Sequence, residues 1–239
     1  MLAVVLLMAL PLLSGATEQK LRLAIDIGHS VKKGGAISAR GKSEFSFNRD
    51  MAFFILEKLK SHPNINPFIL NPYGKYRSLA SRAVAAKKQN ADLFISIHHD
   101  SVQPRFLKKW TINGKKLNYS DKYSGHSLFI SNRNGKPKLS SKFAHLLGVQ
   151  LLNQGLKPTL HHAERIPGEN RRLVNKKLGI YRFDKLAVLR KTIMPAVLLE
   201  CGIIVNRKEE KTVSSSAFKE KITNALTAAL EQYLVQGAL

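Results

Sequence analysis

The stretch LRLAIDIGHS, residues 21–30, contains the first of three apolar runs that decide the fold. Its apolar part, residues 21–27, has the length of a buried strand, and Gly28 begins a loop. Short apolar runs recur at residues 92–97 (DLFISI) and 196–199 (AVLL). We therefore expect three buried strands, the first and second of which run directly into polar residues.

The segments between these runs alternate between helical and extended patterns. Ser43 is placed to cap a helix over residues 44–59, and small apolar residues recur at helical spacing over residues 77–89. The short run PFIL, residues 67–70, reads as a strand between them. The resulting β-α-β-α-β order predicts a single α/β domain with a mostly parallel, twisted sheet of about six strands flanked by helices. Ligands of such sheets gather at the carboxyl ends of the strands.

The rest of the chain interrupts this plan twice. Residues 103–123 and 157–177 are polar and lack sustained periodicity, so both are expected to be excursions from the sheet. A strand is expected at residues 127–131. The patterns at residues 140–153 and 218–234 predict two further helices.

Composition limits the classes of protein to which the chain can belong. With 239 residues, 44% of them apolar, the chain can bury the core of one domain. Lys and Arg outnumber Asp and Glu by 39 to 16, a net charge of +23. Such a charge attracts nucleic acid, anionic lipid or anionic wall polymers, although a solvated surface without a partner is the simpler reading. The single cysteine, Cys201, excludes an intramolecular disulfide and has the apolar flanks of a buried thiol.

The first 16 residues, MLAVVLLMALPLLSGA, resemble a secretory signal peptide that ends in small residues. No basic residue precedes the apolar run, and an uncleaved anchor or a first buried helix is the competing reading. We expect an exported protein of the periplasm, cell envelope or extracellular space, with one domain over residues 20–239.

Three side chains are candidate metal ligands. His29 follows the first strand, Glu44 begins a helix, and His98 follows the strand at residues 92–97. Singly they are weak signals, because a histidine often ends a strand and a first-turn carboxylate is favoured by the helix dipole. If the strand ends converge, two imidazoles and one carboxylate with an open fourth position form a common catalytic zinc set.

Glu200 is harder to explain as a structural residue. It follows the apolar run MPAVLL, and burying an unpaired carboxylate costs several kcal/mol or raises its pKa. It therefore requires a partner, a metal or a task. A carboxylate with a raised pKa is a good general base for zinc-assisted amide hydrolysis.

At these positions the sequence resembles the zinc-dependent N-acetylmuramoyl-L-alanine amidases of the amidase-3 type. The strand-then-GH opening is similar to IDIGHS, the Gly-x-x-Glu motif to Gly41–Glu44, and the Ser-Ile-His motif to Ser96–His98. The block from Leu189 to Gly202, with Met-Pro-Ala-Val-Leu-x-Glu-x-Gly, is the most specific match. Arg82 also fits, and the motifs run in order from about residue 21 to 206.

The resemblance implies a phosphorylase/hydrolase-like fold, and it implies that one zinc ion is held by His29, Glu44 and His98. It also implies that Glu200 is the catalytic base. The implied substrate is the amide bond between N-acetylmuramic acid and the L-alanine of the peptidoglycan stem peptide. The glycines near His29 depart from the family pattern, since four residues intervene before Gly34.

Other residues are assigned supporting roles on the same basis. His99, Arg190 and Asp26 are candidates for contacts with the ligands or the substrate. Some family members carry a helix that plugs the zinc, so Glu164 or Glu169 in the segment 157–177 could act as a gate.

The expected partners are peptidoglycan, anionic wall polymers or the membrane surface, and an activator protein. Nucleic acid is not expected, because the chain lacks a reading motif and has a secretory leader. The alternative function is that of an inactive, amidase-like protein that binds or regulates the wall.

Overall fold

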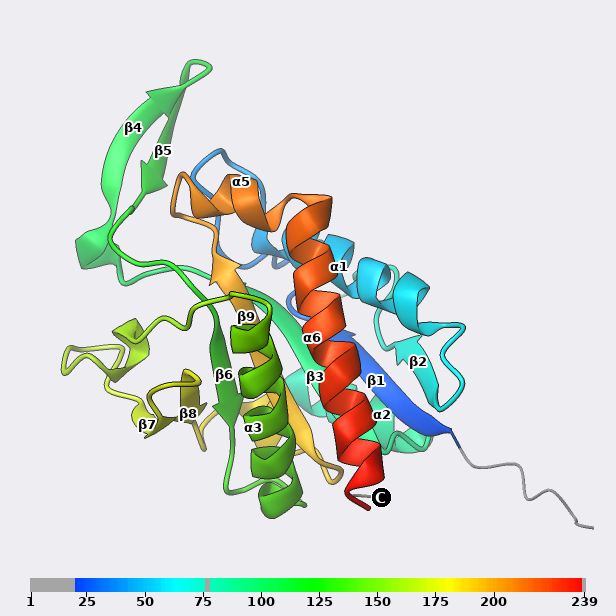
Figure 1. The fold of residues 1–239 in the computed structure, drawn as a ribbon. Helices are drawn as coiled ribbons and strands as arrows, with labels where there is room; N and C mark the ends of the chain where they lie inside the picture. The colour runs from blue at the N-terminus through cyan, green and yellow to red at the C-terminus, as the bar shows by residue number, and fades with distance from the viewer. Residues whose placement is uncertain (1–19, 76–77, 238–239) are drawn as a thin grey trace, which may run out of the picture.

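The computed structural model describes residues 20–75 and 78–237, so the expected leader, residues 1–16, lies outside the described residues. Seven of the strands form one sheet: β1 (Leu21–Ile27), β2 (Ile65–Ile69), β3 (Leu93–Asp100), β6 (Ser127–Ile130), β7 (Arg172–Asn175), β8 (Ile180–Arg182) and β9 (Ala196–Ile203). Their order across the sheet is β2-β1-β3-β9-β6-β8-β7 (Figure 1). Strands β2, β1, β3 and β9 are parallel to one another. Strand β6 is antiparallel to β9, and β7 is antiparallel to β8. The predicted α/β class with a mostly parallel sheet is confirmed.

Helices cover both faces of this sheet. The helices are α1 (Glu44–Leu59), α2 (Leu79–Lys88), α3 (Pro137–Asn153), α4 (Ala187–Arg190), α5 (Glu209–Val213) and α6 (Ser216–Val235), with 3-10 turns η1 (Pro104–Phe106) and η2 (His161–Ala163). Helices α1, α3 and α6 pack on one face, where they contribute to the larger apolar cluster. Helices α2 and α4 contribute to the smaller cluster.

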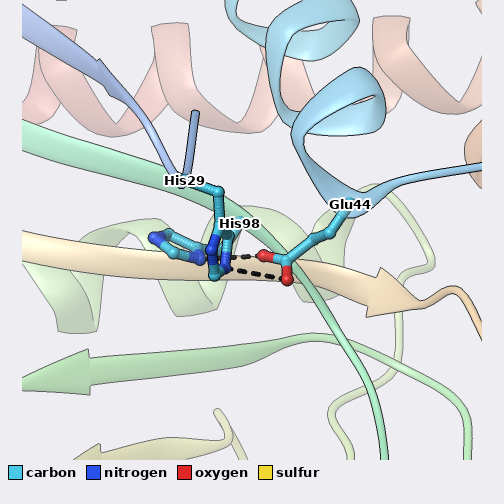
Figure 2. Close-up of side chains that lie close together, drawn as sticks. All are labelled: His29, Glu44 and His98. Carbon is cyan, nitrogen blue, oxygen red and sulfur yellow. Dashed lines mark hydrogen bonds and ion pairs between the residues drawn. The ribbon is translucent and has the colours of Figure 1, made fainter. Parts of the chain in front are cut away.

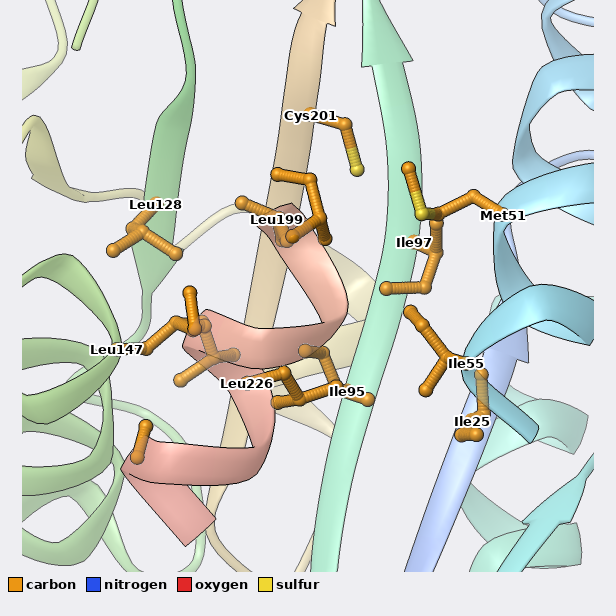
Figure 3. Packing of buried hydrophobic residues seen from close by; sticks show 14 of the residues in the cluster. Ile25, Met51, Ile55, Ile95, Ile97, Leu128, Leu147, Leu199, Cys201 and Leu226 are labelled. Atoms are coloured by element: carbon orange, nitrogen blue, oxygen red, sulfur yellow. The ribbon is translucent and has the colours of Figure 1, made fainter. Parts of the chain in front are cut away.

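The alternation of side chains along β3 and β9 divides the core between these faces. Ile95, Ile97 and Leu199 belong to the larger cluster, as Figure 3 shows, whereas Phe94 and Leu198 belong to the smaller one. Successive strand residues point to opposite faces, so this division follows from the pleat. The even-numbered residues near the ends of β3 and β9 therefore lie on the face of the sheet that α2 and α4 cover. Glu200, two positions after Leu198, lies on this face.

Several predicted boundaries are close to the observed ones. The first strand and the helix over residues 44–59 agree at both ends. Ser43 precedes that helix with extended backbone, but its hydroxyl contacts Ser46 Oγ and makes no capping hydrogen bond. The last strand is longer than expected, because β9 continues to Ile203.

The two polar excursions contain regular structure that periodicity did not predict. The first includes a hairpin of β4 (Lys108–Ile112) and β5 (Lys115–Tyr119), which projects from the body of the molecule (Figure 1). Trp110 connects the hairpin to the rest of the domain, because its indole Nε1 donates a 2.8 Å hydrogen bond to the carbonyl oxygen of Ala39. The second excursion contains η2 and β7. Among the described helices, none combines the length and apolar character needed to span a membrane.

Candidate functional site

His29 lies in the loop directly after β1. Its backbone φ is 67°, a left-handed conformation that is uncommon outside glycine and often found at functional sites. The buried guanidinium of Arg82 holds this backbone, because it donates to the carbonyl oxygens of Ile27 and His29. The strained loop therefore has a fixed support that presents the imidazole at the edge of the sheet.

Glu44, the first residue of α1, contacts both predicted histidine ligands, whose rings lie side by side (Figure 2). Its Oε2 is 2.9 Å from His29 Nε2, and its Oε1 is 2.9 Å from His98 Nδ1. Burial opposes ionisation of Glu44, but hydrogen bonds from His29 and His98 outweigh it and hold the pKa of this carboxyl below its ordinary value. One ligand atom from each of the three side chains lies within 4.8 Å of the others, so the set is compact enough to hold a metal ion.

Two glycines make room for this arrangement. A Cβ atom on Gly28 would lie 2.4 Å from His98 Nε2, and one on Gly35 would lie 2.4 Å from Glu44 Oε2. Gly35 also has a φ of 75°, which side-chain-bearing residues rarely adopt. A larger residue at either position would displace a side chain of the set.

The pleat of β3 separates the neighbouring histidines. His98 faces Glu44, whereas His99 points into the core, where its Nδ1 is 2.8 Å from Asn48 Oδ1. Burial lowers the pKa of His99 to about 3, so its imidazole is neutral. Asn48 in turn donates to Glu44 Oε1. His99 is thus buried behind the candidate ligand set, to which Asn48 connects it.

Glu200 lies beside His98, its partner in the parallel register of β3 and β9. The residue is partly accessible, yet its Oε2 is shielded from solvent and has no hydrogen-bond partner among the described residues. Burial raises its pKa well above the ordinary value, and the charges of Asp100 and Glu44 add to the shift. Glu200 lines a cavity with Asp100, His162 and Glu169, while His29 and His98 line a neighbouring one. The carboxylate therefore lies between two groups of ionisable side chains.

Asp26 and Arg190 were both expected near the ligands or the substrate. Asp26 is buried on β1, where Arg82 Nη1 lies 2.9 Å from its Oδ1 and Ser96 Oγ donates to its Oδ2 at 2.7 Å. Through Arg82 it supports the loop of His29. Arg190 ends helix α4, and among the described residues its side chain has no hydrogen bond or ion pair with the candidate ligands or Glu200.

The carboxylates expected to gate the site are engaged elsewhere in this structure. Glu164 accepts a hydrogen bond from the hydroxyl of Tyr123. Glu169 is hydrogen-bonded to the side chains of His162 and Gln103. Neither contact involves the three candidate ligands, and a gating movement stays a prediction.

A second group of ionisable side chains was not assigned from the sequence. Asp100, at the end of β3, meets His161 and His162 of η2, and these three also offer ligand atoms within 4.8 Å of one another. The only sequence signals are the adjacent histidine pair and the alternation that places Asp100 on the same side of β3 as His98.

These observations define an α/β protein with a candidate metallohydrolase site at the carboxyl edge of a mostly parallel sheet. The model of the N-acetylmuramoyl-L-alanine amidase family Amidase_3 matches residues 23–232. The chain belongs to this family, and its activity is hydrolysis of the amide bond between N-acetylmuramic acid and L-alanine in peptidoglycan.

Individual relatives agree with this assignment. A Buchnera aphidicola relative with the same amidase description is 27% identical over 242 residues, which cover 92% of this chain and 98% of that protein. The catalytic domain of the amidase CwlV from Paenibacillus polymyxa is 25% identical with a TM-score of 0.67, covering 90% of this chain and 98% of that domain. The amidase CwlD of Clostridioides difficile, solved in complex with the GerS lipoprotein, has the same fold at 19% identity and a TM-score of 0.63, covering 91% of this chain and all of CwlD.

Proposed function

We propose that this amidase depends on one zinc ion held by His29, Glu44 and His98, and that Glu200 is its catalytic base. The observation that carries the proposal is the meeting of three ligand atoms, from the loop after β1, from α1 and from β3, within 4.8 Å. Two imidazoles and one carboxylate suit zinc and leave a coordination position for a reactant. The close approach of both rings at Gly28 and Gly35 supports a set built around a small ion.

The chemistry follows from what these residues can do at an amide. A bound zinc ion supplies a Lewis acid that polarises the carbonyl and acidifies water. The unpartnered Oε2 of Glu200 can accept the proton that a water molecule loses as its oxygen attacks the amide carbonyl. The same carboxyl can then give that proton to the departing amine of L-alanine as the C–N bond breaks. Arg82 and Asp26 keep the loop of His29 in place, so they act as positioning residues.

Export of the protein belongs to the same proposal, because its substrate is in the cell wall. A net charge of +23 supports retention on anionic wall polymers or on the membrane surface. The complex of the related CwlD with GerS supports a further proposal, that an activator protein docks on this domain.

The experiment is digestion of purified peptidoglycan before and after chelation, with mass analysis of released peptides that begin at L-alanine. Activity should disappear with chelator and return with zinc. Glu44→Gln should lose activity together with the zinc ion of this set, because the carboxylate contacts both imidazoles. Glu57→Gln, at an exposed position on the same helix, is the matched control and should retain both. Full activity of chelated enzyme, or of Glu44→Gln without zinc, would contradict the proposal.

A further inference from the structure

The cluster of Asp100, His161 and His162 has the donor set of a metal site. Asp100 Oδ2 is 2.7 Å from His162 Nε2 and 3.4 Å from His161 Nε2, so both imidazoles direct the same ring nitrogen at one carboxylate oxygen. The two rings are closely packed, with centroids 3.9 Å apart. One ligand atom from each of the three side chains lies within 4.8 Å of the others.

The opposite nitrogen of each ring is occupied by an oxygen partner. His161 Nδ1 is 2.9 Å from Thr159 Oγ1, and His162 Nδ1 is 2.9 Å from Glu169 Oε2. Histidines that bind metals through one nitrogen almost always have the other nitrogen fixed by a carboxylate, carbonyl or similar oxygen. Both rings are therefore oriented as ligands would be, with Nε2 presented to the space beside Asp100.

The Nε2 atom of His161 lies near Asp100 but makes no hydrogen bond to it. His161 is 3% exposed, and its Nε2 is shielded from solvent without a hydrogen bond to any described residue. A buried polar nitrogen left unsatisfied costs roughly 1–3 kcal/mol. A cation beside Asp100 would remove this cost, because it would accept the lone pair of His161 Nε2.

We propose that Asp100, His161 and His162 bind a second divalent cation of the zinc class. Glu169 and Thr159 orient the two imidazoles from outside the ligand set. The site joins the segment 157–177 to the end of β3. It shares no ligand with the proposed catalytic site, so it can exist whether or not that proposal holds.

The second site lies close to the proposed catalytic base. Asp100 and His162 line the same cavity as Glu200. A cation held there places positive charge near a carboxylate that otherwise faces the negative charges of Asp100 and Glu44. A cation held by Asp100, His161 and His162 would also hold the segment 157–177, which walls this cavity, against the end of β3.

The test counts cations on the full chain. Protein stripped with a chelator is titrated with Zn²⁺, and bound zinc is measured after removal of free ions. Titration with Co²⁺ reports imidazole coordination by its absorption spectrum. Wild-type protein should bind two equivalents. Asp100→Asn, which preserves the shape of the side chain, should bind one, and Glu44→Gln should also bind one.

Two further variants keep the test decisive. His145→Gln, at an exposed position on α3, should still bind two equivalents. Glu169→Gln keeps all three ligands and should weaken one site about 10- to 100-fold, which gives a readout if Asp100→Asn does not fold.

The outcomes separate the two proposals. One equivalent in the wild type that is lost in Glu44→Gln and retained in Asp100→Asn overturns the second site and leaves the catalytic site standing. One equivalent that is lost only in Asp100→Asn supports the second site and contradicts the catalytic assignment. Two equivalents in both wild type and Asp100→Asn show adventitious surface binding and overturn the second site.

Discussion

Two regions of this amidase each bring together two histidines and one carboxylate, but they are built differently. The set of His29, Glu44 and His98 comes from the loop directly after β1, the first turn of α1 and β3. In the second set only Asp100 belongs to the sheet, and both histidines come from a short 3-10 turn within a long excursion. Regular elements fix the first set through the core, whereas the second set depends on how a loop folds back.

This difference teaches which kind of site a sequence reveals. A side chain at the end of a predicted strand takes its position from the sheet, so the strand pattern made His29 and His98 candidates. The full ligand set with Glu44 rested on the resemblance to the amidase family. The position of a side chain in an aperiodic segment cannot be predicted from the order of strands and helices. The second region is therefore defined only by the tertiary contacts of the segment 157–177.

The largest expected effect concerns Glu200, which lies between the two regions. Glu200→Gln should lower the rate of amide hydrolysis by roughly 100- to 10,000-fold, because it removes the proposed base. The measurement is mass analysis of stem peptides released from purified peptidoglycan. Binding to intact wall and zinc content should not change, which separates an enzyme from an inactive wall-binding protein.

Glu231→Gln, at an exposed position on α6, is the control and should retain full activity. Activity of Glu200→Gln within a few-fold of the wild type would remove Glu200 from the mechanism.

The next effect tests how firmly the first region is anchored. Arg82→Gln breaks a buried ion pair and leaves Asp26 without its cation, so the free energy of unfolding should fall by about 3–5 kcal/mol. Affinity for zinc should fall as well, because the guanidinium no longer holds the carbonyl of His29. Urea denaturation and zinc titration measure the two effects.

Lys88→Gln, at an exposed position on the same helix, should leave stability and affinity unchanged. If Arg82→Gln loses stability but binds zinc as the wild type does, Arg82 stabilises the fold and does not position His29 for the metal.

The smallest effect concerns His126, whose backbone pairs with Lys157 and Thr159 at the start of the second region. Burial lowers its pKa to about 4, so the folded protein holds it neutral while the unfolded chain protonates near pH 6.5. Its contribution to stability is full above pH 6.5 and is lost as the pH falls toward 4, by on the order of 3 kcal/mol. The free energy of unfolding measured across this range should fall less steeply in His126→Leu than in the wild type.

His145→Gln is the matched control, because that histidine is exposed on α3 and its loss should leave the slope unchanged. An identical slope in His126→Leu and wild type would show that other groups carry the acid sensitivity.

The accuracy of the sequence predictions followed the same division. Apolar periodicity located β1, α1 and the start of β9, since burial imposes a pattern on the residues of regular elements. It missed the β4-β5 hairpin, because its strands are short and only half-buried at best. The turn residues Asn113 and Gly114, both at positive φ, were the signal that could have located it. The strand expected from the sequence ends at residue 97, whereas β3 continues to Asp100. With the longer strand, its alternation of side chains predicts that His98 and His99 point to opposite faces.

The direct pairing of His98 with Glu200 across β3 and β9 also limits how this protein can change during evolution. A deletion of a single residue within β9 would turn Glu200 toward the core and bring Leu199 or Cys201 to the cavity wall. Only paired insertions or deletions keep a carboxylate at that position. We therefore expect length variation among descendants of this sequence to accumulate in the excursions and to be nearly absent from these two central strands.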